Sequence, residues 1–96
     1  MSVTVLVQVS VKDPEKFGKY GAVAGATIKA AGGEVVGRFR NSEVLAGEFN
    51  HSTFVLITFP DAAAAKAWYA STEYQAVIPL RDEASDMTIV LGEPLD

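Results

Sequence analysis

Valine alternates with other residues near the start of the chain. It stands at every second position of the segment VTVLVQVSV, and this two-residue period predicts a β-strand over 3–11. Similar apolar segments predict strands over 34–40 (EVVGRFR), 53–59 (TFVLITF) and 87–91 (MTIVL). A shorter apolar stretch, EVLA at 43–46, predicts a small strand that returns as a hairpin after the second strand.

Apolar residues at helical spacing follow the first strand. Asp13-Pro14-Glu15 combines a capping side chain, a proline suited to the first helical position and an acid suited to the positive end of the dipole. One helical stripe then holds Phe17, Tyr20, Gly21, Ala24, Ile28 and Ala31, and Gly32-Gly33 ends the helix. Gly18, Gly21 and Gly25 each weaken this helix by up to about 1 kcal/mol. We expect these glycines to let it approach a sheet closely.

Two further helical segments occupy the second half of the chain. Asp61 can cap a helix over 62–70, which is rich in alanine. Ser71-Thr72-Glu73 can cap another stretch over 73–84, with a kink or break at Pro79. The resulting order, β-α-β-β-α-β, predicts an α+β ferredoxin-like fold over residues 1–96 as a single domain. Four antiparallel strands form the sheet, and the helices lie on one face.

The strands are apolar on both faces. In the first strand the valines share one face while Leu6 lies on the other. In the third strand Val55, Ile57 and Phe59 oppose Phe54 and Leu56, and in the fourth Val90 opposes its apolar neighbours. The helices can cover only one face, and an exposed apolar patch of this size is unusual in a monomer. We therefore expect a homodimer that packs sheet against sheet; the alternative is that strand 3 is central and Leu6 and Val90 are tolerated at the surface.

Composition and charge exclude several classes of protein. The chain is 49% hydrophobic, with no apolar run long enough to span a membrane and no basic leader, so we expect a cytoplasmic protein. It has no cysteine, which excludes disulfides and thiolate chemistry. Its 8 basic residues are dispersed among 12 acidic ones, and the net charge of −4 argues against nucleic-acid binding.

The sequence shows no cofactor motif. His51 is the only histidine; it can be a general base, an axial haem ligand or a solvated loop residue, and no nearby residue is a partner for it. Asp82, Glu83 and Asp86 resemble a solvated acidic face more than a metal site. Gly32-Gly33 ends a helix where a phosphate loop would begin one. We expect no metal and no bound cofactor.

Cationic and polar-tipped aromatic residues stand within otherwise apolar elements. Arg38 shares a strand face with Val36 and Arg40, and it either reaches water from an edge strand or is buried against a carboxylate or an anionic ligand. Trp68 and Tyr69 are adjacent on a helix and point about 100° apart, so one of them is expected to line a crevice or interface. We predict a ligand-binding crevice between helices and sheet lined by Tyr20, Arg38, Trp68, Tyr74 and Arg81. Such a crevice suits a small, planar, anionic molecule; alternatively, the aromatic residues are plain core and interface.

The chain resembles the bacterial domain-of-unknown-function family 1330 (DUF1330) over nearly its whole length. The matching stretches are Asp13-Pro14-Glu15 with Phe17 and Tyr20, Gly32-Gly33, Arg38, Glu43-Val44-Leu45, Gly47, Phe59-Pro60, Ala67-Trp68-Tyr69-x-Ser71, Glu73-Tyr74-Gln75 and Leu80-Arg81. The sequence departs from the family where Ala46 and Thr58 replace common glutamates. If those carboxylates serve an activity, this member has lost it; they can equally be partners of Arg38.

The resemblance implies the dimeric α+β barrel form of the ferredoxin-like fold. Proteins of that wider superfamily include cofactor-free monooxygenases, haem-degrading enzymes, muconolactone isomerase and chlorite dismutase, and fold alone does not select among them. Two functions follow. The first is binding or conversion of a small aromatic or anionic molecule, and the second is a non-catalytic dimeric structural or regulatory module. The missing acid–base pair favours the second, and the match around Trp68, Tyr74 and Arg81 favours the first.

Overall fold

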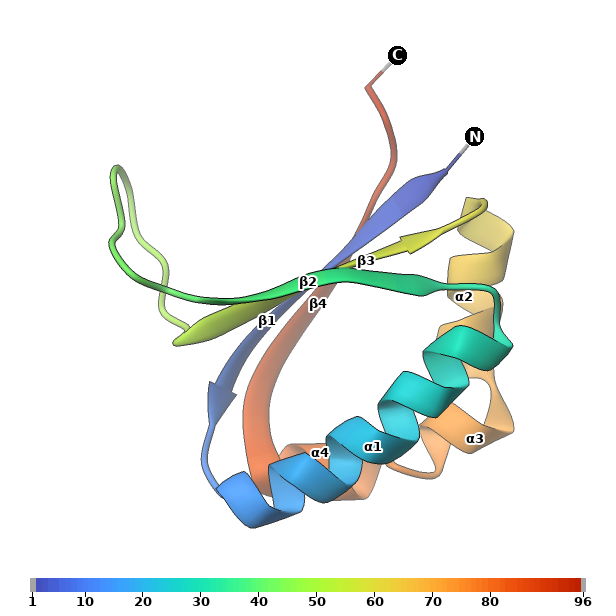
Figure 1. The fold of residues 1–96 in the computed structure, drawn as a ribbon, viewed down its shortest axis with the longest axis horizontal. Helices are drawn as coiled ribbons and strands as arrows, with labels where there is room; N and C mark the ends of the chain where they lie inside the picture. The colour runs from blue at the N-terminus through green and yellow to red at the C-terminus, as the bar shows by residue number, and fades with distance from the viewer. Residues whose placement is uncertain (1, 96) are drawn as a thin grey trace.

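The computed structural model describes residues 2–95 as one sheet with helices on a single side (Figure 1). The strands are β1 (Val3–Val11), β2 (Glu34–Arg40), β3 (Thr53–Phe59) and β4 (Ser85–Gly92). The helices are α1 (Pro14–Ala30), α2 (Ala62–Ala70), α3 (Thr72–Gln75) and α4 (Ile78–Ala84). The predicted bounds of β1, β2, β3 and α2 are confirmed to the residue, and β4 is longer than predicted at both ends.

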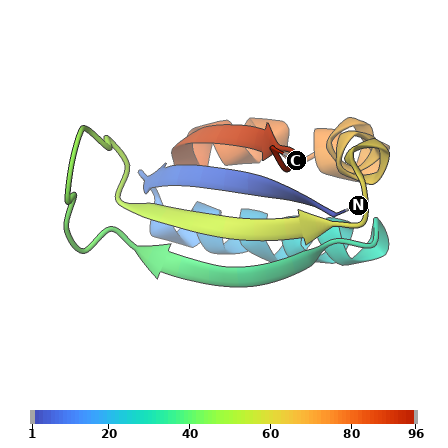
Figure 2. The same ribbon diagram turned by 90° about the horizontal axis from the view of Figure 1, so that it is seen from above.

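The four strands form an antiparallel sheet in the order β2-β3-β1-β4, which confirms the α+β ferredoxin-like fold. Figure 2 shows this order from above, with α1 beneath the β2 side of the sheet and α4 beneath β4. Register places Val55, Val7 and Ile89 side by side across three strands on the face that the helices cover. Leu56, Leu6 and Val90 form the neighbouring row on the opposite face.

Capping side chains fix where the helices begin. The Asp13 carboxylate accepts the Lys16 N–H at 3.2 Å at the start of α1, and Asp61 accepts the Ala64 N–H at 2.7 Å at the start of α2. Ser71 Oγ accepts the Tyr74 N–H at 3.2 Å and begins α3. The break expected at Pro79 is confirmed, although it precedes the proline: α3 ends at Gln75, and Pro79 lies in the first turn of α4.

The core lies between the helices and their face of the sheet. Alternate β1 valines, from Val3 to Val9, are buried there together with Ile57 and Phe59 of β3. From α1, the residues Tyr20, Ala24 and Ile28 are buried, as the helical stripe predicts. Burial of this apolar face is the main force that holds the helices on the sheet.

The predicted small strand at 43–46 is wrong. Residues 41–52 form an irregular loop that projects beyond the end of the sheet (Figures 1 and 2). Its base is closed by the Asn41 N–H, which donates to the Ser52 carbonyl at 2.8 Å, while Leu45 near the tip is 88% exposed. Val44 and Leu45 find no neighbouring strand to pair with at this distance from the sheet, so a short apolar run alone does not make a strand there.

The glycines of α1 do not bring the helix close to the sheet, contrary to expectation. A methyl group added at Gly18, Gly21 or Gly25 would meet no atom within 4 Å beyond its chain neighbours and the adjacent backbone of its own helix. All three residues border a cavity instead. Their absent side chains therefore widen a space between α1 and the sheet.

A β-bulge changes which residues share a face with Arg38. The register runs from Val35 opposite Ile57 to Gly37 opposite Leu56, so two residues of β2 oppose one of β3. Arg38 lies opposite Val55 and therefore faces the helices together with Val35 and Arg40. The predicted partnership with Val36 is wrong, because a strict two-residue period cannot anticipate the extra residue.

Candidate functional site

A cavity of about 670 Å³ lies between α1 and the sheet. Its helix wall includes Phe17, Tyr20 and the glycines of α1, and its sheet wall includes Val7, Val55 and Ile57. The volume lies within the range of small-molecule sites, and the walls are predominantly apolar, as such sites require. The charged residues that line it are Arg38 and Arg40 of β2, so the cavity is positive in a chain of negative net charge.

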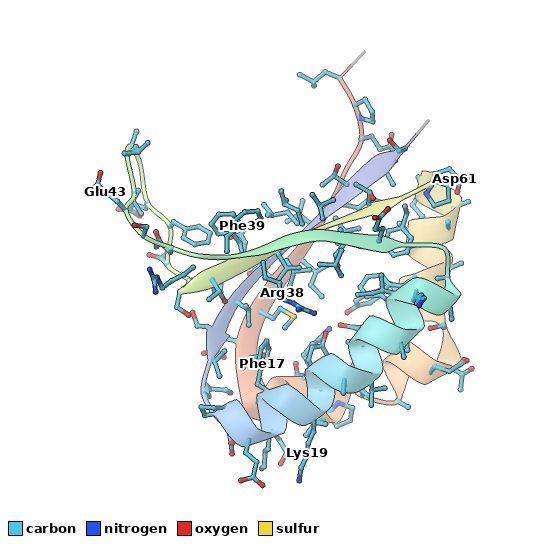
Figure 3. All side chains as sticks on the ribbon, in the orientation of Figure 1. Phe17, Lys19, Arg38, Phe39, Glu43 and Asp61 are labelled. Atoms are coloured by element: carbon cyan, nitrogen blue, oxygen red, sulfur yellow. The ribbon has the colours of Figure 1, made fainter. Side chains whose placement is uncertain are left out.

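Arg38 stands at the open edge of this cavity. Figure 3 shows its side chain below β2 on the α1 side of the strand, whereas Phe39 points to the other side. β2 is an edge strand, the residue is exposed, and within residues 2–95 its guanidinium has no hydrogen-bond or ion-pair partner. This geometry selects the edge-strand alternative, with the guanidinium free to meet an anion at the cavity mouth.

A chain of polar groups runs from the cavity wall through the core. The Tyr20 hydroxyl lies 2.8 Å from the Tyr74 hydroxyl and donates to the Met87 sulfur at 3.9 Å. Tyr74 is 0% exposed, and its hydroxyl accepts a hydrogen bond of 3.2 Å from Arg81 Nη1. The same nitrogen donates to the Tyr69 hydroxyl at 3.2 Å, and Arg81 Nε donates to Asp82 at 3.2 Å.

Burial and hydrogen bonds shift the pKa values of Tyr20 and Arg81. Burial raises the pKa of Tyr20 far above its ordinary value, and the hydrogen bond to Tyr74 adds to the rise. Burial alone would lower the pKa of Arg81, but hydrogen bonds to Tyr69 and Tyr74 outweigh it and raise that pKa. The network therefore consists of a neutral phenol and a permanent cation at neutral pH, neither of which can accept a proton as a general base.

The five residues predicted for one crevice are divided between two cavities. Tyr20, Arg38 and Trp68 line the larger one, whereas Trp68 and Arg81 line a second cavity of about 450 Å³ between α2 and β4. Tyr74 lines neither cavity, because it is fully buried and packs against Trp68 with ring centroids 4.7 Å apart. The Trp68 indole N–H donates to Thr27 Oγ1 at 3.0 Å, which fixes the ring beneath α1.

Trp68 and Tyr69 both line the second cavity, and Trp68 also lines the larger one, so both residues of this pair line a crevice where one was expected to. The Tyr69 hydroxyl is hydrogen-bonded to Arg81, as expected of an aromatic residue with a polar tip. Lys66 and Met87 also line the second cavity, and neither was predicted from the sequence as a site residue. The spacing of Lys66 and Tyr69, three residues apart on one helix, was the available signal.

His51 is not a solvated loop residue without partners. It lies half-buried on the helix-free face of the sheet, where Nδ1 is 3.1 Å from Ser10 Oγ and Nε2 is 3.4 Å from Thr88 Oγ1. Its ring also contacts Phe49 edge to face, with centroids 6.0 Å apart. Strands β1 and β4 supply the hydroxyl partners, which are far from His51 in sequence.

Each acidic residue of the cluster near β4 lies beside a basic side chain, and Asp82 pairs with Arg81. Asp86 lies 3.6 Å from Lys12 Nζ, and Glu83 lies 3.2 Å from Lys16 Nζ. Residues 2–95 contain no cluster of three or more acidic or histidine side chains arranged to hold a metal ion. Within the same residues, no helix is long and apolar enough to cross a membrane.

A comparison with the sequence profiles of protein families identifies the family of this chain. The sequence profile of DUF1330, a domain of unknown function, matches residues 2–94. The chain belongs to the DUF1330 family. No curated protein matches it.

Solved structures resemble this DUF1330 protein in fold. RPA0582 from Rhodopseudomonas palustris, a protein of unknown function, has 19% identity over 99% of this chain and 83% of its own, with a TM-score of 0.82. A DABB family protein with a ferredoxin-like fold from Mesorhizobium loti has 14% identity over 99% and 98%, with a TM-score of 0.72. SnoaB, a cofactor-independent oxygenase from Streptomyces nogalater, has 18% identity over 99% and 94%, with a TM-score of 0.68.

The resemblance to DUF1330 implies glutamates where this chain has Ala46 and Thr58, and of these two positions Thr58 lies on the opposite face of the sheet from Arg38. Thr58 pairs with Thr4 and Glu34 on the helix-free side of the sheet, since its neighbours Ile57 and Phe59 face the core. Ala46 lies in the projecting loop. A glutamate at position 58 would therefore stand on the opposite face from Arg38, so the register removes one of the two carboxylate partners that the sequence offered.

Proposed function

We propose that this DUF1330 protein binds a small, planar, mainly apolar molecule with one anionic group in the cavity between α1 and the sheet. The ligand's apolar body lies against the glycines of α1 and the valines of the sheet, and its anionic group meets Arg38 at the mouth. Tyr20 supplies a hydroxyl deeper in the cavity. Tyr74 and Arg81 act as positioning residues, because they hold Tyr20 from behind without lining this space themselves.

The observation that carries this proposal is the open space beside the glycines. Three glycines in one helix weaken it, and in this structure no close contact explains them. They border an apolar cavity of about 670 Å³ whose cations have no protein partner within residues 2–95. A ligand that fills the space and pairs with Arg38 accounts for both features.

Binding without acid–base catalysis fits the polar groups of this cavity. Among the described residues, its lining includes arginines, Tyr20 and Thr53 but no carboxylate and no imidazole. Such groups can stabilise an anion but cannot abstract a proton at neutral pH. The oxygenase description of SnoaB extends to this chain only for a substrate that reacts with oxygen without a protein base.

A thermal-shift screen of aromatic carboxylates, quinones and haem, followed by titration of the strongest binder, tests the proposal. We expect a planar carboxylate such as 2-naphthoate to raise the melting temperature, and 2-naphthamide to do so much less. Arg38→Ala should weaken 2-naphthoate binding by about 1–3 kcal/mol, the range for a hydrogen bond to a charged group. Equal affinity for the acid and the amide, unchanged by Arg38→Ala, would refute the anion site.

We also propose that two copies pair through their helix-free sheet faces. That face carries Leu6, Leu56, Phe54 and the exposed residues Phe39 and Val90. Phe39 and Phe54 stack there with ring centroids 5.1 Å apart, and Phe49 joins them edge to face. An aromatic patch of this kind supports a two-fold partner, and it equally serves the alternative function of a non-catalytic dimeric module.

A further inference from the structure

The cavity between α2 and β4 shares Trp68, Met87 and Ile89 with the one beneath α1 but has its own cationic residues. Its floor and walls are apolar and include Ala65, Trp68, Ile89 and Leu91. Its polar lining consists of Lys66, Tyr69 and Arg81, and no acidic residue of the described chain lines it. An apolar space with two cations at its border selects a ligand that has an apolar body and a negative end.

Arg81 is held in place with part of its guanidinium unused. Nε donates to Asp82, and Nη1 donates to both Tyr69 and Tyr74. Nη2 has no acceptor within residues 2–95, yet it is not among the buried polar atoms that lack a partner, so it remains accessible. The side chain as a whole is only 15% exposed. A guanidinium fixed by three acceptors offers its remaining N–H groups with little loss of conformational freedom.

Lys66 supplies the second positive charge. It is exposed on α2, borders the cavity, and has no ion-pair partner in the part of the chain that the structure describes. Asp82 occupies the Nε edge of Arg81 but does not line the cavity. The charge that faces the cavity is therefore positive even with Asp82 in place.

We infer that the α2–β4 cavity is a second binding site, for a small monocarboxylate with an apolar tail. The carboxylate accepts from Arg81 Nη2 and lies near Lys66, and the tail lies against Ile89 and Leu91. One guanidinium nitrogen without an acceptor and one lysine match a singly charged carboxylate. A phosphate dianion would bring a larger desolvation cost into this apolar space. The inference does not depend on a ligand beneath α1.

Amide-shift NMR with hexanoate as the probe tests this site against the larger cavity. Saturable shifts are expected at Lys66, Tyr69 and Leu91, which border only the smaller cavity, rather than at Gly21 or Arg38. Hexanol, which has the same tail without the charge, should bind much more weakly. Shifts confined to Gly21 and Arg38, no saturable shifts, or equal affinity for hexanol would overturn the second site, and the first of these results would leave the larger cavity supported.

Matched lysine variants distinguish hexanoate binding at this site from a general effect of the protein's charge on affinity. Lys66→Met should weaken hexanoate binding about fivefold, as for a partly exposed ion pair. Lys29→Met removes an exposed lysine of α1 that borders neither cavity, and it should leave the affinity unchanged. Arg81→Lys should cost about tenfold or more. If that variant does not fold, the comparison of Lys66 with Lys29 decides, and an equal loss in both rejects the site.

Discussion

Tyr20 illustrates how one hydroxyl links the core to the proposed site. Its hydroxyl bonds Tyr74 within a buried network, so Tyr20→Phe should lower the free energy of unfolding by about 1 kcal/mol at neutral pH. The measurement is urea unfolding of both proteins. Tyr69→Phe, which removes a more exposed hydroxyl at the other end of the network, is the matched control. A gain in stability in Tyr20→Phe would show that this hydrogen bond does not stabilise the fold.

The raised pKa of Tyr20 also predicts a dependence on alkaline pH. In the unfolded chain a tyrosine ionises near pH 10. Because burial raises the pKa in the folded protein, the unfolded state binds fewer protons above that pH, and stability falls as pH rises. The decline above about pH 10 should be shallower in Tyr20→Phe than in the natural sequence or in Tyr69→Phe. Parallel declines in all three would contradict the assignment.

At the scale of elements, a substitution at an α1 glycine shows how much helix stability these residues cost. Gly18 is exposed and has open space around it, so Gly18→Ala should stabilise the protein by roughly 1 kcal/mol through helix propensity alone. Thermal and urea unfolding measure this. A loss of stability would mean that the residue makes a close contact absent from this structure. If Gly18→Ala is more stable, as expected, the natural glycine makes the helix less stable and leaves the cavity open.

Elements defined by local pattern were predictable, and those defined by their neighbours were not. The alternation in β1 and the helix caps at Asp13 and Asp61 depend only on residues close together in the sequence. The bounds of β1 and the starts of α1 and α2 can therefore be predicted from the sequence. The bulge beside Val36 depends on register against β3, and the loop at 43–46 depends on having no strand beside it. The contact of Tyr74 with Arg81 crosses the break before Pro79, which no helical spacing describes.

At the scale of the whole molecule, the helix-free face predicts association. Leu56→Asp places a charge in the centre of that face and should dissociate or unfold the protein, because a buried unpaired charge is costly. Val23→Asp, on an exposed position of α1, should leave it unchanged. Light scattering at micromolar concentration should give twice the 10.2 kDa of one chain for the natural sequence and for Val23→Asp. A monomer mass for the natural sequence would refute the dimer.

At the same scale, the packing of the helices on the sheet divides the predicted site residues between two cavities. Sequence reasoning brought Tyr20, Arg38, Trp68, Tyr74 and Arg81 together because each interrupts an apolar element. It could not show that Tyr74 would be fully buried and line neither cavity, since that depends on how the helices pack on the sheet. The fold was therefore more predictable than the cavities within it.

The central claim is that a ligand occupies the space beneath α1, and filling that space tests it most directly. Gly21 borders the cavity, and a methyl group added there would meet no atom within 4 Å beyond the adjacent part of its own helix. Ala26 is an exposed residue of the same helix that borders neither cavity. Isothermal titration with 2-naphthoate should show binding to the natural sequence and to Ala26→Leu but at least tenfold weaker binding to Gly21→Leu, with all three proteins folded. Undiminished affinity in Gly21→Leu would contradict the account.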